Sequence, residues 1–335
     1  MLGSLLAAAL ATSVRLGALG IGTGTWGGRC ALPWALRSSA EEEVRQRAVF
    51  ARAVRCGVKL FDGADAPSAP AERVFGALRR DIERTDARLA RSLTFGVQLA
   101  GAGDASYEGE CLKSLERTGL GQLDIAHAPP RPLVRAQERA RWEALAKLHR
   151  QGLCKTVGVS LSGASELRAC ARFLAAQSVP VACTRAAFSL AAIAPLEEGL
   201  VDACADERIA LLAYAPFGPA DALSGEYSLD RLPSGARGCA VRRALSSSLE
   251  LVQTIEDVAR AKGATVGQIA LSWVMAKGAV PVVAPRSLVQ LDEYLGARAV
   301  SLSGGEVAEL DVASRYGVRR RGILDNLGLA AAYAR

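Results

Sequence analysis

Histidine, lysine and methionine are scarce in this chain of 335 residues, which contains two histidines, six lysines and two methionines. The eight cysteines are scattered, with no Cys-x-x-Cys pair and no spacing typical of metal ligands. With only His127 and His149 to complement them, we expect no zinc site and no other metal site. The pattern instead predicts free, mostly buried thiols in a reducing compartment.

Long hydrophobic runs are also absent. No uncharged apolar stretch reaches 18 residues, so we expect no membrane span in this chain. The N-terminal stretch is short, apolar and rich in small residues, but it lacks the positively charged start of a secretory signal. We interpret residues 1–18 either as an N-terminal strand pair or as the remnant of a targeting region.

Positive charge is plentiful but not concentrated. The formal net charge of +7 comes from arginine, which supplies 35 of the 41 basic residues. These residues are spread along the chain without interleaved aromatics, and the densest run is only Arg319-Arg320-Arg321. No nucleic-acid-binding motif accompanies them. We therefore predict a solvated basic surface and no nucleic-acid partner.

Short apolar runs alternate with amphipathic segments every 25–45 residues or so, as in βα units around a parallel sheet. The pattern predicts eight strands, at 19–22, 58–61, 93–97, 123–126, 156–159, 179–183, 210–213 and 280–283. Eight such units and no low-complexity linker predict an α/β fold of the (β/α)₈ TIM-barrel class, with residues 1–335 forming a single domain.

Helical patterns separate these strands. They cover residues 41–56, 71–80, 107–117, 136–150, 165–176, 196–206 and 265–276, and 288–297 follows the last strand. Residues 216–243 are rich in Gly, Pro, Ser and Arg, and we interpret them as a long loop over one mouth of the barrel. Residues 301–335 are predicted to form a C-terminal helix and tail.

Polar residues follow most of the predicted strands. In barrels of this class, functional side chains lie at the carboxyl ends of the strands. We therefore expect one shared mouth to contain the residues found there, namely Asp62, Gln98, His127, Ser160, Arg185, Tyr214 and Arg286.

Several short motifs occur in the order and spacing of one known family. They are Leu19-Gly-Ile-Gly followed by Trp26-Gly27, Phe61-Asp-Gly-Ala-Asp65, Val157-Gly-Val-Ser160, Tyr214-Ala-Pro216 and Gln268-Ile-Ala-Leu-Ser-Trp273. From about residue 15 to residue 315 the chain resembles the aldo-keto reductases, and most closely the plastid branch of that family. The resemblance implies a barrel that reduces carbonyl groups with hydride from NADPH.

The same resemblance implies a catalytic set of four residues. A tyrosine acts as the general acid, a lysine lowers the pKa of that tyrosine, an aspartate holds the lysine, and a histidine orients the carbonyl. Asp62 falls on the aspartate position. Pro67 stands at the tyrosine position and Gln98 at the lysine position, and no tyrosine occurs between Asp62 and Tyr107. Both losses affect the proton-transfer groups.

His127 can be aligned in two ways. The His-Ala-Pro sequence places it at the family's catalytic histidine. The Leu120-Gly-Gln-Leu-Asp124 segment instead brings it two residues early, which keeps the same face of the strand. A structural histidine near a strand end is the alternative interpretation. Asp62 likewise has an alternative role, as a carboxylate that caps a turn.

The cofactor positions are partly kept. The resemblance implies that Ser160 holds the nicotinamide amide, whereas Leu161 replaces an asparagine and Arg185 a glutamine. Tyr214 stands where the family stacks an aromatic ring on the nicotinamide. The segment for the 2′-phosphate is best preserved, in Arg286, Ser287, Gln290 and Glu293, with a surface arginine as the alternative for Arg286. Trp26 is a further cofactor candidate, although a tryptophan there is more typical of the core.

Three functions follow as hypotheses. The favoured one is a pseudoenzyme, an accessory or scaffold subunit of a larger plastid complex of the photosynthetic type, with weak or no NADP(H) binding. The alternative is an active NADPH-dependent reductase with rearranged catalysis. The third is a non-redox enzyme that reuses Asp62 and His127. The plastid location rests on the resemblance, and a cytoplasmic location is the alternative.

Overall fold

The computed structural model describes residues 14–24, 26, 40–63, 69–99, 104–129, 135–161 and 163–320. Eight parallel strands close into one barrel in chain order, β1 pairing with both β2 and β8. The strands are β1 (Gly20–Gly22), β2 (Leu60–Asp62), β3 (Thr94–Gln98), β4 (Leu123–His127), β5 (Cys154–Val159), β6 (Val181–Ala187), β7 (Ala210–Tyr214) and β8 (Val280–Val283). The predicted (β/α)₈ class and all eight predicted strands are confirmed, with shifts of at most a few residues at their ends.

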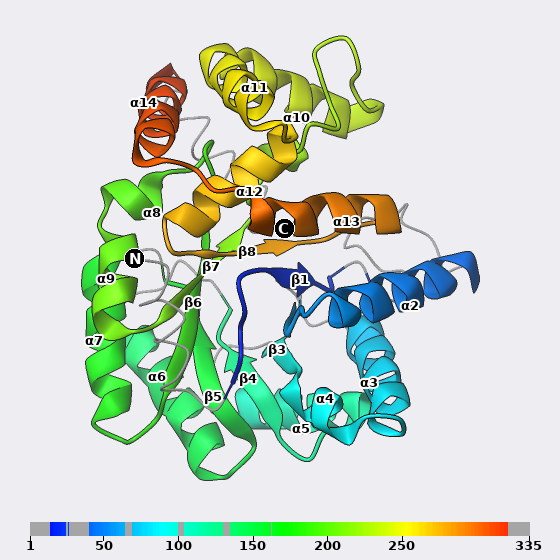
Figure 1. Ribbon diagram of the computed structural model, residues 1–335. Coiled ribbons are helices and arrows are strands. Elements are labelled where there is room, and N and C mark those ends of the chain that lie inside the picture. Colours follow the sequence, from blue (N-terminus) through cyan, green and yellow to red (C-terminus); the bar gives the residue numbers. More distant parts are fainter. Residues whose placement is uncertain are drawn as a thin grey trace.

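Helices surround the barrel (Figure 1). They are α2 (Ala40–Arg55), α3 (Ala69–Glu83), α4 (Ala87–Ser92), α5 (Asp104–Thr118), α6 (Arg135–Arg150), α7 (Ala164–Ala175), α8 (Ala194–Glu197), α9 (Leu200–Glu207), α10 (Gly235–Ser246), α11 (Leu249–Lys262), α12 (Val266–Ala276), α13 (Leu288–Gly296) and α14 (Gly304–Arg320). Two short 3₁₀ turns, η1 (Pro219–Asp221) and η2 (Ala297–Ala299), complete the elements of the described chain.

The two main parts of the core reflect the two apolar faces of each strand, and a third, small cluster contains Ala222, Val241 and Leu245. Between the sheet and its helices, aromatic rings pack in series, and the rings of Phe75 and Phe95 stack with centroids 4.0 Å apart. Inside the barrel, Val14 and Leu16 join Leu60 and Ile125 in a separate buried cluster. The segment before β1 therefore fills one end of the barrel, and the other end remains for chemistry.

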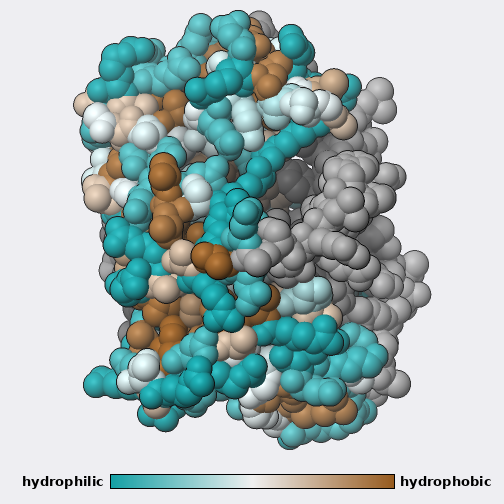
Figure 2. All heavy atoms as spheres, turned by 90° about the vertical axis from the view of Figure 1, so that its right-hand side faces the viewer, coloured by the Kyte–Doolittle hydropathy of each residue, from teal (hydrophilic) through white to brown (hydrophobic). Residues whose placement is uncertain are grey.

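One face of the molecule shows how polar and apolar side chains are distributed on the described surface. Figure 2 shows a largely hydrophilic face on which hydrophobic patches are small and separated. Among the exposed large apolar side chains are Val44 of α2 and Val289 of α13. Within the described ranges, no helix combines the length and the apolar composition needed to cross a bilayer.

Four segments differ from the predicted pattern, one of which is α4, a short helix that was not expected. The helix expected at 196–206 is split into α8 and α9, because Gly199 adopts a left-handed backbone with φ of 74°. Residues 216–243 are not one loop, since α10 begins at Gly235. Its buried residues are only Gly238, Val241 and Leu245, a stripe too sparse among arginines to be recognised in the sequence. Helix α11 was also not expected.

The two ends of the chain are described in part. Residues 14–18 lie outside any strand, and residues 1–13 are outside the described range, so the structure does not test the strand pair or targeting remnant expected at 1–18. Helix α14 covers Gly304–Arg320, within the predicted C-terminal helix and tail, and residues 321–335 are again outside the described range.

Candidate active site

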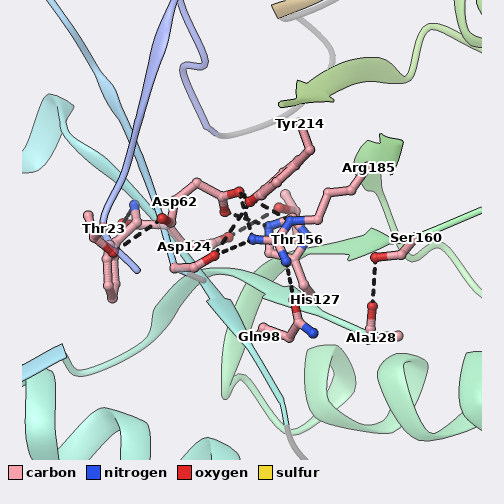
Figure 3. Close-up of polar contacts among 12 residues, drawn as sticks. Thr23, Asp62, Gln98, Asp124, His127, Ala128, Thr156, Ser160, Arg185 and Tyr214 are labelled. Atoms are coloured by element: carbon pink, nitrogen blue, oxygen red, sulfur yellow. Dashed lines mark hydrogen bonds and ion pairs between the residues drawn. The ribbon is translucent and has the colours of Figure 1, made fainter. Parts of the chain in front are cut away.

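Five of the predicted site residues converge at the carboxyl end of the barrel (Figure 3). Asp62, Gln98, His127 and Tyr214 are the last residues of β2, β3, β4 and β7, and Arg185 lies within β6. A parallel barrel brings all its strand ends to one rim, so residues far apart in sequence meet there. Pro67, the residue at the tyrosine position, lies outside the described residues.

Arg185 is the centre of this group. Its Nε and Nη2 donate hydrogen bonds to Asp62 Oδ2 at 3.1 and 2.6 Å, and Nη2 also donates to the Gly63 carbonyl at 2.6 Å. Its Nη1 donates to Gln98 Oε1. The whole residue is only 5% exposed. The guanidinium is therefore held in place by a carboxylate, an amide and a backbone carbonyl, the planar donor pattern for which arginine is suited.

Tyr214 closes the group from the side of β7. Its hydroxyl donates to Asp62 Oδ2, and the Arg185 guanidinium carbon lies 4.9 Å from the centre of its ring. A cation at that distance over an aromatic face is attracted to it. The phenol is thus engaged with the same carboxylate as the arginine.

His127 fills the space between β3 and β5. The ring is fully buried, with Nε2 3.3 Å from Asp62 Oδ1, and Nδ1 has no hydrogen-bond partner in the part of the chain that the structure describes. Glycines make the room: a Cβ at Gly96 would overlap Asp62 and His127, and a Cβ at Gly158 would overlap the imidazole. The two glycines, on the strands that flank β4 on either side, therefore fix where the ring lies.

Burial and charge set the protonation of this pair. Burial alone would raise the pKa of Asp62, but the Arg185 guanidinium and the His127 ring outweigh it and hold that pKa at about 2. Burial, reinforced by the positive charge of Arg185, lowers the pKa of His127 to about 4. At neutral pH the site therefore contains an ionised Asp62, a charged Arg185 and a neutral imidazole.

A cleft of about 240 Å³ opens beside this group, between the ends of β1, β7 and β8. The predicted residues Arg286 and Gln290 line it together with Asp62 and Tyr214. Asp221 and Glu226, from the segment that follows β7, also line it, and the sequence analysis did not single them out. Two acidic residues shortly after a strand end were the signal that could have identified them.

The remaining predicted residues lie around these two features. Ser160 follows β5 and donates to the Ala128 carbonyl at 3.1 Å. Ser287 caps α13, and Glu293 accepts a hydrogen bond from Thr265 at 2.8 Å. Trp26 is 3% exposed and packs on Phe50 and Phe61, so it belongs to the core. These positions do not form part of the cleft lining, which includes neither Ser287 nor Glu293.

Comparison with known proteins identifies the family to which this barrel belongs. The model of the aldo/keto reductase family matches residues 18–315. The chain belongs to the aldo/keto reductase family. The chloroplastic pyridoxal reductase of Arabidopsis thaliana is 27% identical over 310 residues, covering 89% of this chain and 83% of that relative. An NADP⁺-linked aldo-keto reductase of Schizosaccharomyces pombe is 34% identical over 204 residues, 59% of this chain and 58% of that relative.

Solved aldo-keto reductase structures share the fold. A thermostable member in complex with the inhibitor epalrestat superposes with a TM-score of 0.67 at 22% identity, covering 90% of this chain and 97% of its own. The Klebsiella pneumoniae enzyme in complex with NADPH gives 0.65 at 23% identity, with coverage of 90% and 94%.

In this aldo-keto reductase barrel, the residues at position 98 on β3 and position 185 on β6 differ from those that the family resemblance implies. The family pattern implies a lysine at position 98 and a glutamine at position 185, whereas here Gln98 and Arg185 stand in those places. The positive charge that contacts Asp62 comes from Arg185 on β6, whereas the resemblance implies a cation on β3. The hydrogen bond between Arg185 and Gln98 joins these two positions, which are 87 residues apart in the chain.

The residues present fit one half of an NADP(H) molecule better than the other. The cleft offers Arg286 and Gln290 toward a phosphate and the rings of Phe217 and Tyr294 as apolar walls. At the nicotinamide end, Leu161 supplies no side-chain hydrogen bond and Arg185 is committed to Asp62. Among the described residues, no group of three or more His, Cys, Asp or Glu side chains could hold a metal ion.

Proposed function

We propose that this aldo-keto reductase barrel is a pseudoenzyme that does not reduce carbonyl groups. The observation that carries the proposal is the commitment of Arg185 to Asp62, Gln98 and the Gly63 carbonyl. These contacts restore the charge balance that the missing lysine would have provided, but they do so without a phenol acid beside a tunable ammonium group.

Accessibility supports the same proposal. Asp62 and His127 are completely buried and Arg185 is 5% exposed. Asp62 borders the cleft at the mouth, whereas neither His127 nor Arg185 is among the residues that line it. A general acid must come within about 3 Å of the atom that it protonates. The NADPH of an active family member supplies hydride when bound, yet reduction also needs a proton, and Pro67 supplies none.

We further propose that the chain serves as an accessory or scaffold subunit of a plastid complex. The chloroplastic relative supports the compartment. A barrel that has lost its acid but kept its core still presents a large, fixed surface, which is what a scaffold requires. Affinity purification from isolated plastids, followed by size-exclusion chromatography, tests this role. Elution of the chain only as a free monomer would contradict it.

In this proposal NADP(H) binds weakly or not at all. Arg286 is the charged group that remains for the 2′-phosphate, and its side chain already lies 3.7 Å from the Asp221 carboxylate. Part of its charge is therefore satisfied within the protein before any nucleotide arrives.

Steady-state kinetics tests the central claim. Purified protein is incubated with NADPH and a panel of aldehydes, ketones and pyridoxal, and the loss of NADPH absorbance is followed. We expect no turnover above background in a sample shown to be folded by circular dichroism. Turnover above about 1 s⁻¹, an ordinary enzymatic rate, would overturn the proposal.

One observation favours a second candidate, an active reductase with rearranged catalysis. A phenol, a guanidinium, a carboxylate and an imidazole meet at the mouth, in Tyr214, Arg185, Asp62 and His127. In that case Tyr214 would donate the proton. If turnover is found, Tyr214→Phe decides: a loss of about 10²-fold or more assigns the acid to Tyr214, and unchanged turnover excludes it.

A further inference from the structure

The acidic side chains of the cleft do not belong to the sealed group around Arg185. Asp221 and Glu226 come from the segment between β7 and α10 and face the same cleft as Arg286 and Gln290. Glu226 Oε2 accepts a hydrogen bond from Gln290 Nε2 at 3.4 Å, and Asp221 Oδ2 lies 3.7 Å from Arg286 Nη2. The end of the cleft that holds the predicted phosphate-binding residues therefore also carries two carboxylates.

The backbone holds Asp221 in position. Ala215, Ala220 and Asp221 all have positive φ, a conformation that costs non-glycine residues energy and that often marks functional segments. Hydrogen bonds from Leu223 N to Phe217 O at 2.9 Å and from Ser224 N to Asp221 O at 3.0 Å fix the segment. Arg237 Nη2 also donates to Asp221 Oδ2, at 2.8 Å. The carboxylate is thus anchored on one side by Arg237 and faces Arg286 on the other.

A phosphate and a hydroxyl group would meet this arrangement differently. Because Asp221 Oδ2 lies 3.7 Å from Arg286 Nη2, a ribose 2′-phosphate bound to Arg286 would lie near a carboxylate, and like charges repel each other. A ribose 2′-hydroxyl instead donates a hydrogen bond to a carboxylate, which is how an acidic residue selects NAD over NADP in dinucleotide-binding sites.

We propose that Asp221, together with Glu226, makes this cleft prefer a dinucleotide whose adenosine ribose carries a free 2′-hydroxyl, that is, NAD(H) over NADP(H). The inference rests on the retained nucleotide cleft of the proposed function. It also gives a physical reason for weak NADP(H) binding: Asp221 competes with the 2′-phosphate for Arg286.

Fluorescence titration of the full chain with NADH and with NADPH tests the preference. We expect wild-type protein to bind NADH more tightly than NADPH. The double variant Asp221→Asn/Glu226→Gln should bind NADPH about 10-fold more tightly than wild type, since one close like-charge contact is worth at least 1 kcal/mol or so. Its affinity for NADH should change less than about 3-fold, because an amide still accepts a hydrogen bond.

Two further variants keep the test decisive. Asp230→Asn removes an exposed acid from the same segment that does not line the cleft, and it should leave both affinities unchanged. Glu226→Gln alone alters an exposed side chain, and it should show part of the gain even if the double variant fails to fold.

The outcomes separate this inference from the proposed function. Tighter binding of NADPH by wild type, or unchanged selectivity in both Glu226→Gln and the double variant, would overturn the inference. Failure of wild type and both variants to bind either dinucleotide would also overturn it, and would leave the absence of carbonyl reduction intact. Carbonyl turnover refutes the pseudoenzyme proposal whichever dinucleotide is preferred.

Discussion

The group of residues around Arg185 and the cleft beside it lie at the same rim of the barrel. The charged side chains are buried in the first region and partly exposed in the second. In the group around Arg185, Asp62 is wholly buried and forms an ion pair with Arg185 at 2.6 Å. In the cleft, the side chains of Arg286 and Asp221 are 52% and 41% exposed and lie 3.7 Å apart. A buried charge that loses its ion-pair partner remains unpaired unless another side chain replaces that partner. An exposed charge is solvated by water instead, so its partner can be substituted at little cost in stability.

This difference explains why the two regions diverge from the family pattern in different ways. An unpaired buried carboxylate costs about 3–5 kcal/mol, so loss of the lysine at position 98 is tolerable only with a replacement such as Arg185. Exposed ion pairs contribute about 0–1 kcal/mol, so substitutions of the acids at the cleft should have little effect on the fold. The following variants test this contrast.

Arg185→Leu should have the largest effect. It leaves Asp62 buried without its ion-pair partner, and we expect the free energy of unfolding to fall by about 3–5 kcal/mol in urea denaturation. Arg168→Leu, which removes a surface arginine 2.9 Å from Asp206, is the control and should cost less than about 1 kcal/mol. Similar losses for both variants would show that burial does not distinguish the two ion pairs.

His127 should make stability depend on pH. The unfolded chain protonates this histidine near its ordinary pKa of 6.5, whereas burial and Arg185 hold the folded pKa at about 4. Between these values the unfolded state binds the extra proton, so stability decreases as pH falls, by about 1.4 kcal/mol per unit.

Urea denaturation from pH 7 to pH 4 measures this dependence. His127→Asn should remove this loss of stability at low pH. Glu138, whose pKa is raised to about 7 by burial and the neighbouring Glu166, contributes with the opposite sign in both proteins. His149→Asn removes the other histidine of the chain and serves as the control. If the slope disappears in the His149 variant and persists in the His127 variant, the assignment to His127 is wrong.

Gly158→Ala should cost about 1–3 kcal/mol, because its Cβ would overlap the His127 ring. Gly109→Ala makes the same chemical change within α5, where an added Cβ meets no atom within 4 Å, and should stabilise the protein by about 0.5–1 kcal/mol. Thermal melts distinguish the two effects: the melting temperature should fall for Gly158→Ala and rise for Gly109→Ala. A melting temperature unchanged by Gly158→Ala would mean that the space around the His127 ring accommodates an added methyl group.

Thr265→Ala should have the smallest effect, although Thr265 caps α12 and its hydroxyl donates to Glu293 at 2.8 Å beside the nucleotide end. Loss of such a cap costs about 1 kcal/mol. Thr265→Ser keeps the hydroxyl and should cost less in the same denaturation assay. If Thr265→Ala lowered the free energy of unfolding as much as Arg185→Leu does, burial would not explain the difference in stability between the two regions.

The sequence predicted the barrel well because each strand is a short apolar run that must be buried on both faces. It also predicted that Asp62 and Arg286 lie near strand ends, since a parallel barrel gathers those ends. The direction of the Arg185 side chain was not predictable in this way. Its contact with Gln98 spans 87 positions in the chain and depends on the packing of two strands that are not neighbours.

Local sequence patterns were least informative in segments whose secondary structure depends on tertiary packing. Helix α10 buries three residues in an arginine-rich segment that has the composition of a loop. The left-handed Gly199 divides α8 from α9 within a continuous apolar pattern. Asp221 gained its significance only from its place opposite Arg286, 65 positions further along the chain.

The exchange between positions 98 and 185 also constrains how such a sequence can change. An intermediate with Gln98 but without Arg185 leaves Asp62 buried and unpaired. An intermediate with lysine at 98 and Arg185 places two cations around one buried carboxylate. We therefore expect each intermediate to be less stable than either end point, so that the effect of a substitution at one position depends on the residue at the other. In that case single substitutions at position 98 or 185 should lower the free energy of unfolding more than the paired change does.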